Sequence, residues 1–257
     1  MPALFVTPFV VFTFVLARMG AVVITAPVFG MNAVPTQVRA LLAFALALVI
    51  TPMQLAAPLT MPTNLPQYAV CLGGELLVGA LLGMGVMILL SGAQLAGQII
   101  SQMSGLSLAD VFSPGLDTEV PVVANLLNIL TLAVFVIIGG HRLLVGAVLD
   151  TYTFVPIAHV SFPDSLGPLI STLLAESFSL AVRGAAPAMV ALMLATIVLG
   201  LISRTLPQLN VLSFGFGLNA LVSFVALAFS IGAIAWLFQE QLEPAVQTIV
   251  DSLRPSI

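Results

Sequence analysis

Five polar side chains interrupt runs of sequence that are otherwise strongly apolar. They are Arg18, Glu75, Glu176, Arg183 and Asn219. A charge at the centre of a helix in lipid costs about 2.5 to 3.5 kcal/mol even on insertion scales, so each group should face protein or water. Such groups form ion pairs and hydrogen bonds between helices, or they line a path for a substrate or a proton. We favour the structural role. Because Glu176 and Arg183 are two helical turns apart, we expect each to meet a partner on another helix.

The local signatures of metal, thiol, acyl-transfer and nucleotide chemistry are absent from the sequence. It contains no H-E-x-x-H, C-x-x-C, nucleophile elbow or Gly-rich phosphate loop. The histidines His141 and His159 fall next to turns, and Cys71 falls in an apolar run where a small buried hydrophobe is the ordinary role. We therefore expect no enzymatic activity, no cofactor and no metal site.

The composition is that of a protein whose solvent is lipid or other apolar protein. Of its 257 residues, 60% are hydrophobic and 6% are charged, whereas soluble domains carry about 25% charged residues. Runs such as Ala40 to Ile50 lack the alternation of a barrel strand, which leaves helices as the spanning structure. The net charge is -4 and all six cationic side chains are scattered arginines, which argues against a nucleic-acid partner.

The apolar runs predict an all-α integral membrane protein with six main helices. The segments are residues 3–29, 37–56, 66–103, 121–139, 166–203 and 210–238, and residues 141–157 form a weaker seventh that lies flat or packs as a short helix. Segments 66–103 and 166–203 would each be about 57 Å long, against an apolar layer of about 30 Å. We expect them to tilt, to break at glycine and proline, or to leave the membrane. Residues 239–257 read as an acidic, amphipathic tail, and we treat 1–257 as one subunit.

Small residues spaced at helical intervals predict close packing of neighbouring helices. Gly79 and Gly83 form a G-x-x-x-G pair, which lets two helix backbones approach each other. The pattern is common in Gly-rich apolar sequence, and it names no partner.

The interior loop from 104 to 121 combines acidic and apolar residues. It contains Asp110, Asp117 and Glu119 without a compensating cation, together with several large apolar side chains. A solvated connector would not need those apolar side chains, and long loops inside compact proteins are commonly functional. We expect an ordered insertion that docks against a wall.

Four groups of residues, spread over nearly the full length, carry more information than the composition does. The first group is Ala17-Arg18, then Pro27-Val28-Phe29-Gly30, and Pro35 followed by Arg39. The second is Glu75 with Gly79 and Gly83. The third is Ala96-Gly97-Gln98-Ile99-Ile100, Gly105-Leu106-Ser107-Leu108-Ala109 and Ser113-Pro114. The fourth, which is the most specific, is Gly200 and Arg204 followed by Pro207-Gln208-Leu209-Asn210-Val211. With these residues the chain resembles the FliR family of the flagellar export gate and its T-type counterparts in type III secretion.

The sequence departs from the pattern of that family at three positions. Gln98 stands where an acidic residue is usual, Ser113 where an Asp often precedes the proline, and Gly217 where a proline is common. The first two departures bear on a charge-dependent role of the loop, and the third bears on helix geometry.

The resemblance implies a non-enzymatic subunit of a helical export gate in the bacterial inner membrane, at the base of a flagellum or an injectisome. Its partners would be P-type and Q-type subunits, with the B-type or U-type switch protein and the A-type or V-type export protein nearby. Unfolded proteins would pass through the pore of this hetero-oligomer. The family also implies that the loop plugs the closed pore, a role carried onto Gly105, Leu106, Phe112 and Pro114, with Met103 at its edge. Gly105 and Gly115 would supply the hinge.

On the same resemblance, the remaining matched and polar residues are candidates for helix packing and assembly. They are Arg18, Glu75, Gly79, Gly83, Glu176, Arg183, Arg204, Pro207, Gln208 and Asn210.

Two other classes of function remain open at this point. A small-solute secondary transporter would use midplane charges and broken helices as a binding site, but the sequence shows no clear internal repeat. An intramembrane hydrolase would need a nucleophile or paired aspartates within apolar helices, whereas Asp110 and Asp117 fall in the loop and Asp150 stands alone.

Overall fold

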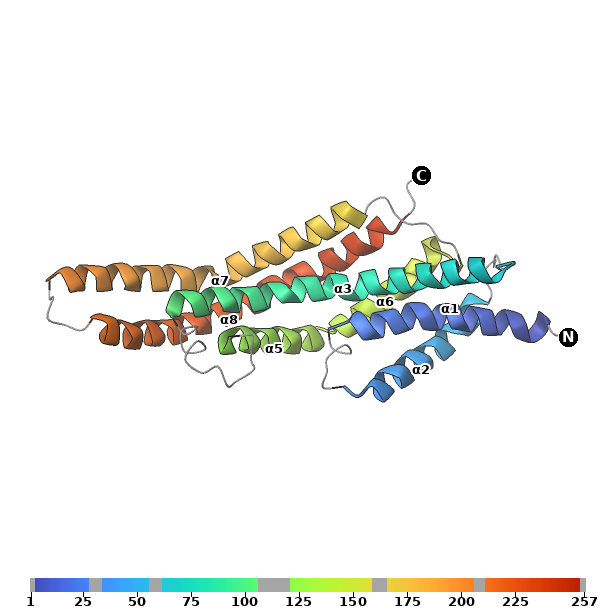
Figure 1. Ribbon diagram of the computed structural model, residues 1–257, viewed down its shortest axis with the longest axis horizontal. Helices are drawn as coiled ribbons and strands as arrows, with labels where there is room; N and C mark the ends of the chain where they lie inside the picture. The colour runs from blue at the N-terminus through green and yellow to red at the C-terminus, as the bar shows by residue number, and fades with distance from the viewer. Residues whose placement is uncertain are drawn as a thin grey trace. The chain divides into compact units, whose positions relative to one another are not determined.

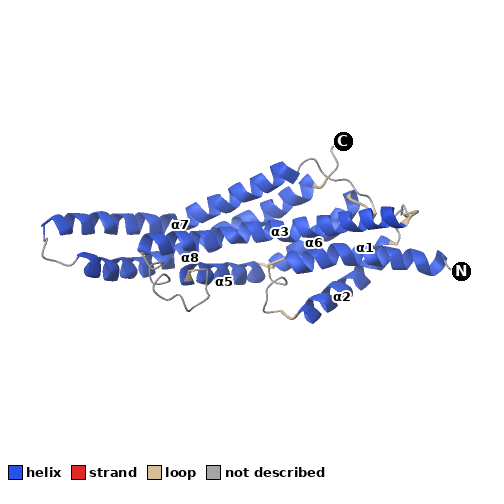
Figure 2. Ribbon diagram, in the orientation of Figure 1, coloured by secondary structure: helices blue, strands red, loops and turns tan. Residues whose placement is uncertain are grey.

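The computed structural model describes residues 3–27, 34–55, 62–105, 121–158, 166–205 and 211–254. These residues form seven helices and contain no strand (Figure 2). The helices, labelled in Figure 1, are α1 (Ala3–Thr25), α2 (Thr36–Gln54), α3 (Leu65–Ser104), α5 (Val122–Ile137), α6 (Gly140–Phe154), α7 (Leu166–Thr205) and α8 (Val211–Ser252). The all-helical prediction is confirmed.

Most of these helices have the length and the apolarity of membrane spans. Five qualify individually, and the number rises to six if α5 and α6 count as one bent span. The prediction of about six main apolar segments is therefore confirmed, and the architecture fits a multi-pass membrane protein.

The two longest predicted segments do not break at their glycines. α3 and α7 are each one uninterrupted helix of 40 residues, and α7 contains Pro187 in its interior. At 1.5 Å per residue each is about 60 Å long, twice the thickness of the apolar layer. Of the three ways to accommodate this length, tilting or leaving the membrane remain.

Most of the glycines of α3 serve packing instead of interruption. A Cβ atom added at Gly79, Gly83, Gly92 or Gly97 would collide with the backbone or a side chain of a neighbouring helix. Missing side chains at these positions allow close helix contacts, while the intact backbone hydrogen bonds keep α3 continuous.

The last helix is longer than the sequence predicted. The predicted end at residue 238 is wrong, because α8 continues to Ser252. Leu242, Ala245, Val246 and Ile249 are buried, and their spacing of three and four residues places them on one face of the helix. The acidic stretch that we took for a separate tail is therefore the amphipathic end of α8.

The chain divides into two compact units. The first consists of Met1–Ile88, Val136–Leu173 and Leu242–Ile257, and the second of Leu89–Phe135 and Leu174–Gln241. In the first unit α1 and α2 pack together, with the rings of Phe12 and Phe44 edge to face at 5.4 Å between centroids. In the second unit Phe135 and Phe238 make a similar contact at 6.4 Å.

The weak seventh segment is a short packed helix, which is one of the two alternatives predicted for it. Gly139, with a φ of +77°, precedes α6 in the left-handed conformation that glycine adopts without strain. Leu144, Val148, Thr151 and Tyr152 are buried on one side of α6. The end of this helix therefore points polar groups into the interior of the first unit.

Candidate functional site

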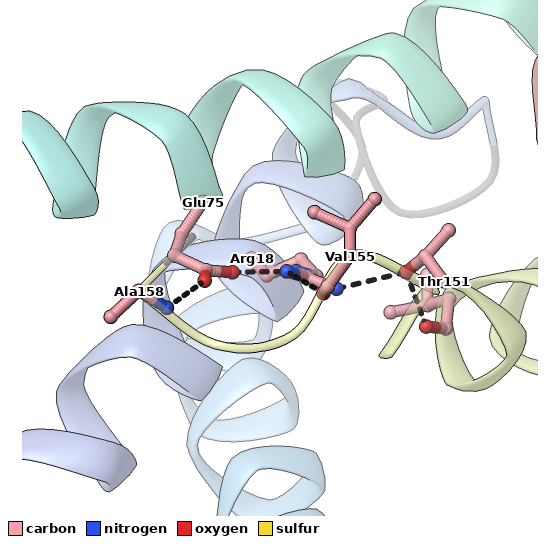
Figure 3. A network of polar contacts seen from close by, with 6 residues as sticks. Arg18, Glu75, Thr151, Val155 and Ala158 are labelled. Carbon is pink, nitrogen blue, oxygen red and sulfur yellow. Dashed lines mark hydrogen bonds and ion pairs between the residues drawn. The ribbon is translucent and has the colours of Figure 1, made fainter. Parts of the chain in front are cut away.

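Arg18 and Glu75 form a buried ion pair at the centre of the first unit. Arg18 comes from α1 and Glu75 from α3, 57 residues later (Figure 3). The Arg18 Nε donates to Glu75 Oε2 at 2.6 Å, and the two side chains are 1% and 2% exposed. A buried pair is favourable only if its remaining donors and acceptors are also satisfied.

The end of α6 satisfies the rest of the Arg18 guanidinium. Nη1 donates to the Thr151 hydroxyl oxygen at 3.0 Å, and Nη2 donates to the Val155 carbonyl oxygen at 3.1 Å (Figure 3). The guanidinium carbon also lies 4.1 Å from the centre of the Tyr152 ring. All three nitrogens of the side chain therefore have an acceptor, and one face of the group has an aromatic contact.

The turn after α6 satisfies the second oxygen of Glu75. The Ala158 N–H donates to Glu75 Oε1 at 3.2 Å (Figure 3). Ala158 has a φ of +64°, a conformation that costs an L-residue about 1 to 2 kcal/mol. Cys71, one turn before Glu75, donates its thiol hydrogen to the Ala158 carbonyl oxygen at 3.3 Å. α3 thus contacts both polar groups of this strained residue.

Two glycines of α3 bring its backbone against α1 beside the ion pair. A Cβ atom at Gly79 would collide with the backbone carbonyl oxygen of Arg18, and one at Gly83 would collide with the Thr25 hydroxyl. On the other side of Arg18, the Tyr68 hydroxyl donates to the Thr13 hydroxyl oxygen at 2.8 Å. α3 therefore contacts α1 at Tyr68, Gly79 and Gly83, and the ion pair lies between Tyr68 and Gly79.

The chemistry that this arrangement supports is structural. Both carboxylate oxygens accept hydrogen bonds and each guanidinium nitrogen donates one, so both charged groups are engaged with each other and with the end of α6. No group of three or more His, Cys, Asp or Glu residues in the described ranges could hold a metal ion. The network ties α1, α3 and the end of α6 together, and removing one charge would leave the other buried and unpaired.

The other polar residues of the apolar helices are not brought into this network. Glu176 on α7 is half-buried, and its Oε2 is buried without a hydrogen-bond partner in the described structure. Arg183 is exposed on the same helix. Asn219 on α8 is half-buried, and its amide oxygen likewise has no partner among the described residues. The predicted partners of Glu176 and Arg183 on other helices stay a prediction.

The candidate plug and the most specific family string are described only at their edges. Met103 is exposed near the end of α3, and Gly105 follows the helix with a φ of +77°. Arg204 is exposed in the last turn of α7. The remaining predicted residues lie outside the described ranges, and they are Leu106, Phe112, Pro114, Gly115, Pro207, Gln208 and Asn210.

The contribution of α6 to the site was not predicted. Thr151 and Tyr152 form part of a short polar run that ends an apolar helix, and this run was a usable signal. No side-chain pattern could have indicated Val155 and Ala158, because both act through backbone groups.

The chain matches the family model described as bacterial export proteins, family 1, over residues 9–245. This match includes α1 to α7 almost completely and most of α8. Both residues of the buried ion pair fall inside it.

Several curated relatives carry the name flagellar biosynthetic protein FliR. The protein from Caulobacter vibrioides is 28% identical over 239 residues, which is 92% of this chain and 95% of the relative. The protein from Bacillus subtilis is 27% identical over 94% of this chain and 93% of its own length. The protein from Escherichia coli is 27% identical over 83% of this chain and 81% of its own length. The family model matches nearly the whole length of this helical, membrane-type chain, which therefore belongs to the bacterial export proteins of family 1, the family of the FliR proteins.

Proposed function

We propose that this chain is a subunit of a protein export gate of the flagellar or type III secretion kind. It joins P-type and Q-type subunits in the inner membrane and lines a closed pore through which unfolded proteins leave the cytoplasm. The B-type or U-type switch protein and the A-type or V-type export protein dock nearby. The observation that carries the proposal is the family match over residues 9–245. The names of the relatives favour the flagellar system.

The surface of the chain supports an assembled state. Large apolar side chains are exposed along α7 and α8, among them Phe178, Met193, Phe224, Phe229 and Trp236. Apolar patches of this extent are covered by lipid or by other protein in the functional molecule. A subunit surrounded by similar helices meets this requirement without any active site.

The buried ion pair supports a role as scaffold within that assembly. Arg18 and Glu75 fix α1 against α3 and the end of α6, so they determine the surface that the first unit offers to neighbours. Loss of either charge acts on assembly, and it acts on export only through assembly.

The loop from 104 to 121 acts as the plug of the closed pore. Gly105 has a φ of +77° directly after α3, so the chain leaves the helix through a residue that accepts this conformation without strain. Apolar side chains exclude water and ions, and they can be displaced more cheaply than a buried ion-pair network.

The proposed assembly is tested by co-expression with candidate P-type and Q-type subunits, followed by mass measurement of the intact complex in detergent. A complex that contains all three subunits is the expected result. If this chain is recovered alone while the other two assemble, the proposal is wrong. Uptake of a small solute by the purified chain in liposomes would favour a transporter instead.

The plug is tested separately with ion conductance. Deletion of residues 106–116 from the assembled complex should make membranes leak ions, and so should replacement of Leu106, Val111 and Phe112 by serine at constant loop length. The control replaces Asp110 and Asp117 by asparagine and should stay tight. Unchanged conductance in the deletion variant would remove the loop from the gate and leave the assembly proposal intact.

A further inference from the structure

Arg183 is a charged side chain at one end of an exposed apolar helix face. It lies on α7 and is exposed. Val190 and Leu194, which lie two and three turns further along the same face of the helix, are 61% and 58% exposed. A cation with such neighbours is unusual on a surface that only lipid covers.

No acidic residue in the described ranges neutralises this arginine. The ion pairs formed there join Arg18 to Glu75 and Arg254 to Asp251. Glu176, which is the acidic residue of α7, keeps its Oε2 buried and without a hydrogen bond two turns away. Within the second unit, the positive charge is therefore matched by nothing that the structure describes.

Arg183 lies far from both ends of α7. Arg183 is about 26 Å from the first residue of α7 and about 33 Å from the last, at 1.5 Å per residue. An arginine side chain that snorkels spans only a small part of either distance. Where lipid surrounds this level of α7, the charge has no solvation. Where α7 leaves the membrane, the exposed apolar residues of the same face need a protein cover, which takes the charge out of water. In both cases the charge needs a partner at its own level of the helix.

Arg183 belongs to a stripe of exposed residues at helical spacing. We call this the α7 stripe, and it consists of Ser179, Arg183, Val190, Leu194, Ile197 and Leu201. The stripe contains no acidic residue, so two copies of the chain that packed stripe against stripe would leave both arginines unpaired. Lipid tails would leave the charge unpaired as well.

We propose that the α7 stripe packs against a helix of a different subunit, and that this helix presents an Asp or Glu carboxylate to Arg183. The apolar residues of the stripe provide the contact area, and the ion pair fixes which partner binds and in which register. An unpaired charge buried in an apolar interface is costly, so partners without a carboxylate at this level are rejected. This inference rests on the proposed function for the existence of a multi-subunit assembly.

The composition of the chain makes the contact accessible to a site-specific experiment. The six cationic residues are all arginines, so the chain contains no lysine. Arg183→Lys introduces one side-chain amine and keeps the positive charge. A membrane-permeant carbodiimide then joins this amine to a carboxylate that contacts it, as an amide, while the carboxylate loses one oxygen to the urea by-product.

The experiment is run in native membranes that contain the whole export apparatus. Full-length Arg183→Lys is compared with the unchanged chain, whose α-amino group is its remaining amine, and with Arg142→Lys. Arg142 is an exposed arginine in the first turn of α6 and provides the matched control. Peptide mass spectrometry identifies the linked residues.

The expected product is one amide between the amine introduced at position 183 and a defined Asp or Glu in a helix of another subunit, absent from both controls. If the Arg183→Lys chain forms no adduct at this position above the level of the unchanged chain, the inference is overturned. An adduct between two copies of the chain overturns it as well. An adduct to a subunit that is neither P-type nor Q-type, and is neither the switch protein nor the export protein, keeps the inference but contradicts the proposed partners. If the chain copurifies with P-type and Q-type subunits but forms no adduct at position 183, the proposed function stands and this inference is overturned.

A second variant tests the energetic role of the charge. Arg183→Met keeps much of the apolar length and leaves the partner carboxylate unpaired, so recovery of the assembled complex should fall by about tenfold or more. Arg183→Lys should restore most of it, and Arg142→Met should have no effect. If Arg183→Met assembles as well as the unchanged chain, lipid or an apolar surface covers the stripe and the inference is wrong.

Discussion

Gly79 packs directly against the backbone carbonyl oxygen of Arg18, one turn along α3 from the carboxylate that binds the side chain of the same arginine. The backbone contact and the ion pair therefore depend on each other. α1 and α3 must approach closely for Glu75 to reach Arg18, and only a residue without a side chain permits this approach.

Adding a side chain at Gly79 should destabilise the first unit. Gly79→Ala forces α1 and α3 apart and should lower the free energy of unfolding in detergent by about 1 to 3 kcal/mol, as overpacking does elsewhere. The control is Gly73→Ala on the same helix, where an added Cβ meets nothing within 4 Å. That change should be neutral or stabilising by up to about 1 kcal/mol, because alanine has the higher helix propensity. Equal effects of the two substitutions would contradict the close contact.

Breaking the buried ion pair on one side should cost more than removing it altogether. Arg18→Met or Glu75→Met leaves an uncompensated buried charge and should lower the free energy of unfolding by about 3 to 5 kcal/mol. The double variant removes both charges and should recover a large part of that loss, as a double-mutant cycle will measure. Arg254→Met breaks the exposed pair with Asp251 and should change stability by less than about 1 kcal/mol. Strictly additive losses in the double variant would show that the two residues do not interact.

Substitutions at the two left-handed residues Ala158 and Gly139 should change stability in opposite directions. Ala158→Gly relieves the strain of a φ of +64° and should leave stability unchanged or raise it by up to about 1 kcal/mol. Gly139→Ala introduces the same strain at a φ of +77°, with only the Arg142 side chain within 4 Å of the new Cβ, and should cost about 1 to 2 kcal/mol. Thermal unfolding of both variants in one detergent decides the matter, and a clear loss of stability in Ala158→Gly would contradict this geometry.

A disulfide should connect α3 and α7 in the second unit. The hydroxyl oxygens of Ser91 and Ser177 are 3.4 Å apart, and an added Cβ at Gly92 would lie 2.5 Å from the Ser177 carbonyl oxygen. In a Cys71→Ser background, Ser91→Cys with Ser177→Cys should oxidise almost completely within one chain. Protease cleavage between the two helices, followed by electrophoresis with and without reductant, reports the bond. Ser91→Cys paired with Ser179→Cys is the control and should stay reduced within the chain, because the two-residue shift rotates the thiol away from α3.

The sequence predicted the fold class and most helix positions because both follow from local and compositional features. In lipid a chain must satisfy its own backbone hydrogen bonds, so long apolar runs predict helices. Six of the predicted segments begin and end within a few residues of the observed helices. The prediction was wrong at the end of α8, where acidic residues on the exposed side masked a buried face made by Leu242, Val246 and Ile249. Of the three alternatives predicted for the long segments, a break at glycine does not occur in α3. The sequence could not decide this, because a glycine that packs against a neighbour looks the same in sequence as a glycine that interrupts a helix.

By itself, then, the sequence determined that the chain is helical, that it is suited to a membrane and that it resembles an export-gate family. It also showed that Arg18 and Glu75 could not face lipid. The tertiary structure decided that these two residues bind each other, that the backbone at Val155 and Ala158 completes their hydrogen bonds, and that Arg183 finds no such partner among the residues described. Composition and local spacing determine that the chain is helical and that lipid or apolar protein surrounds it. Whether a buried charge finds a partner depends instead on which groups the folded backbone brings within about 3 Å of it.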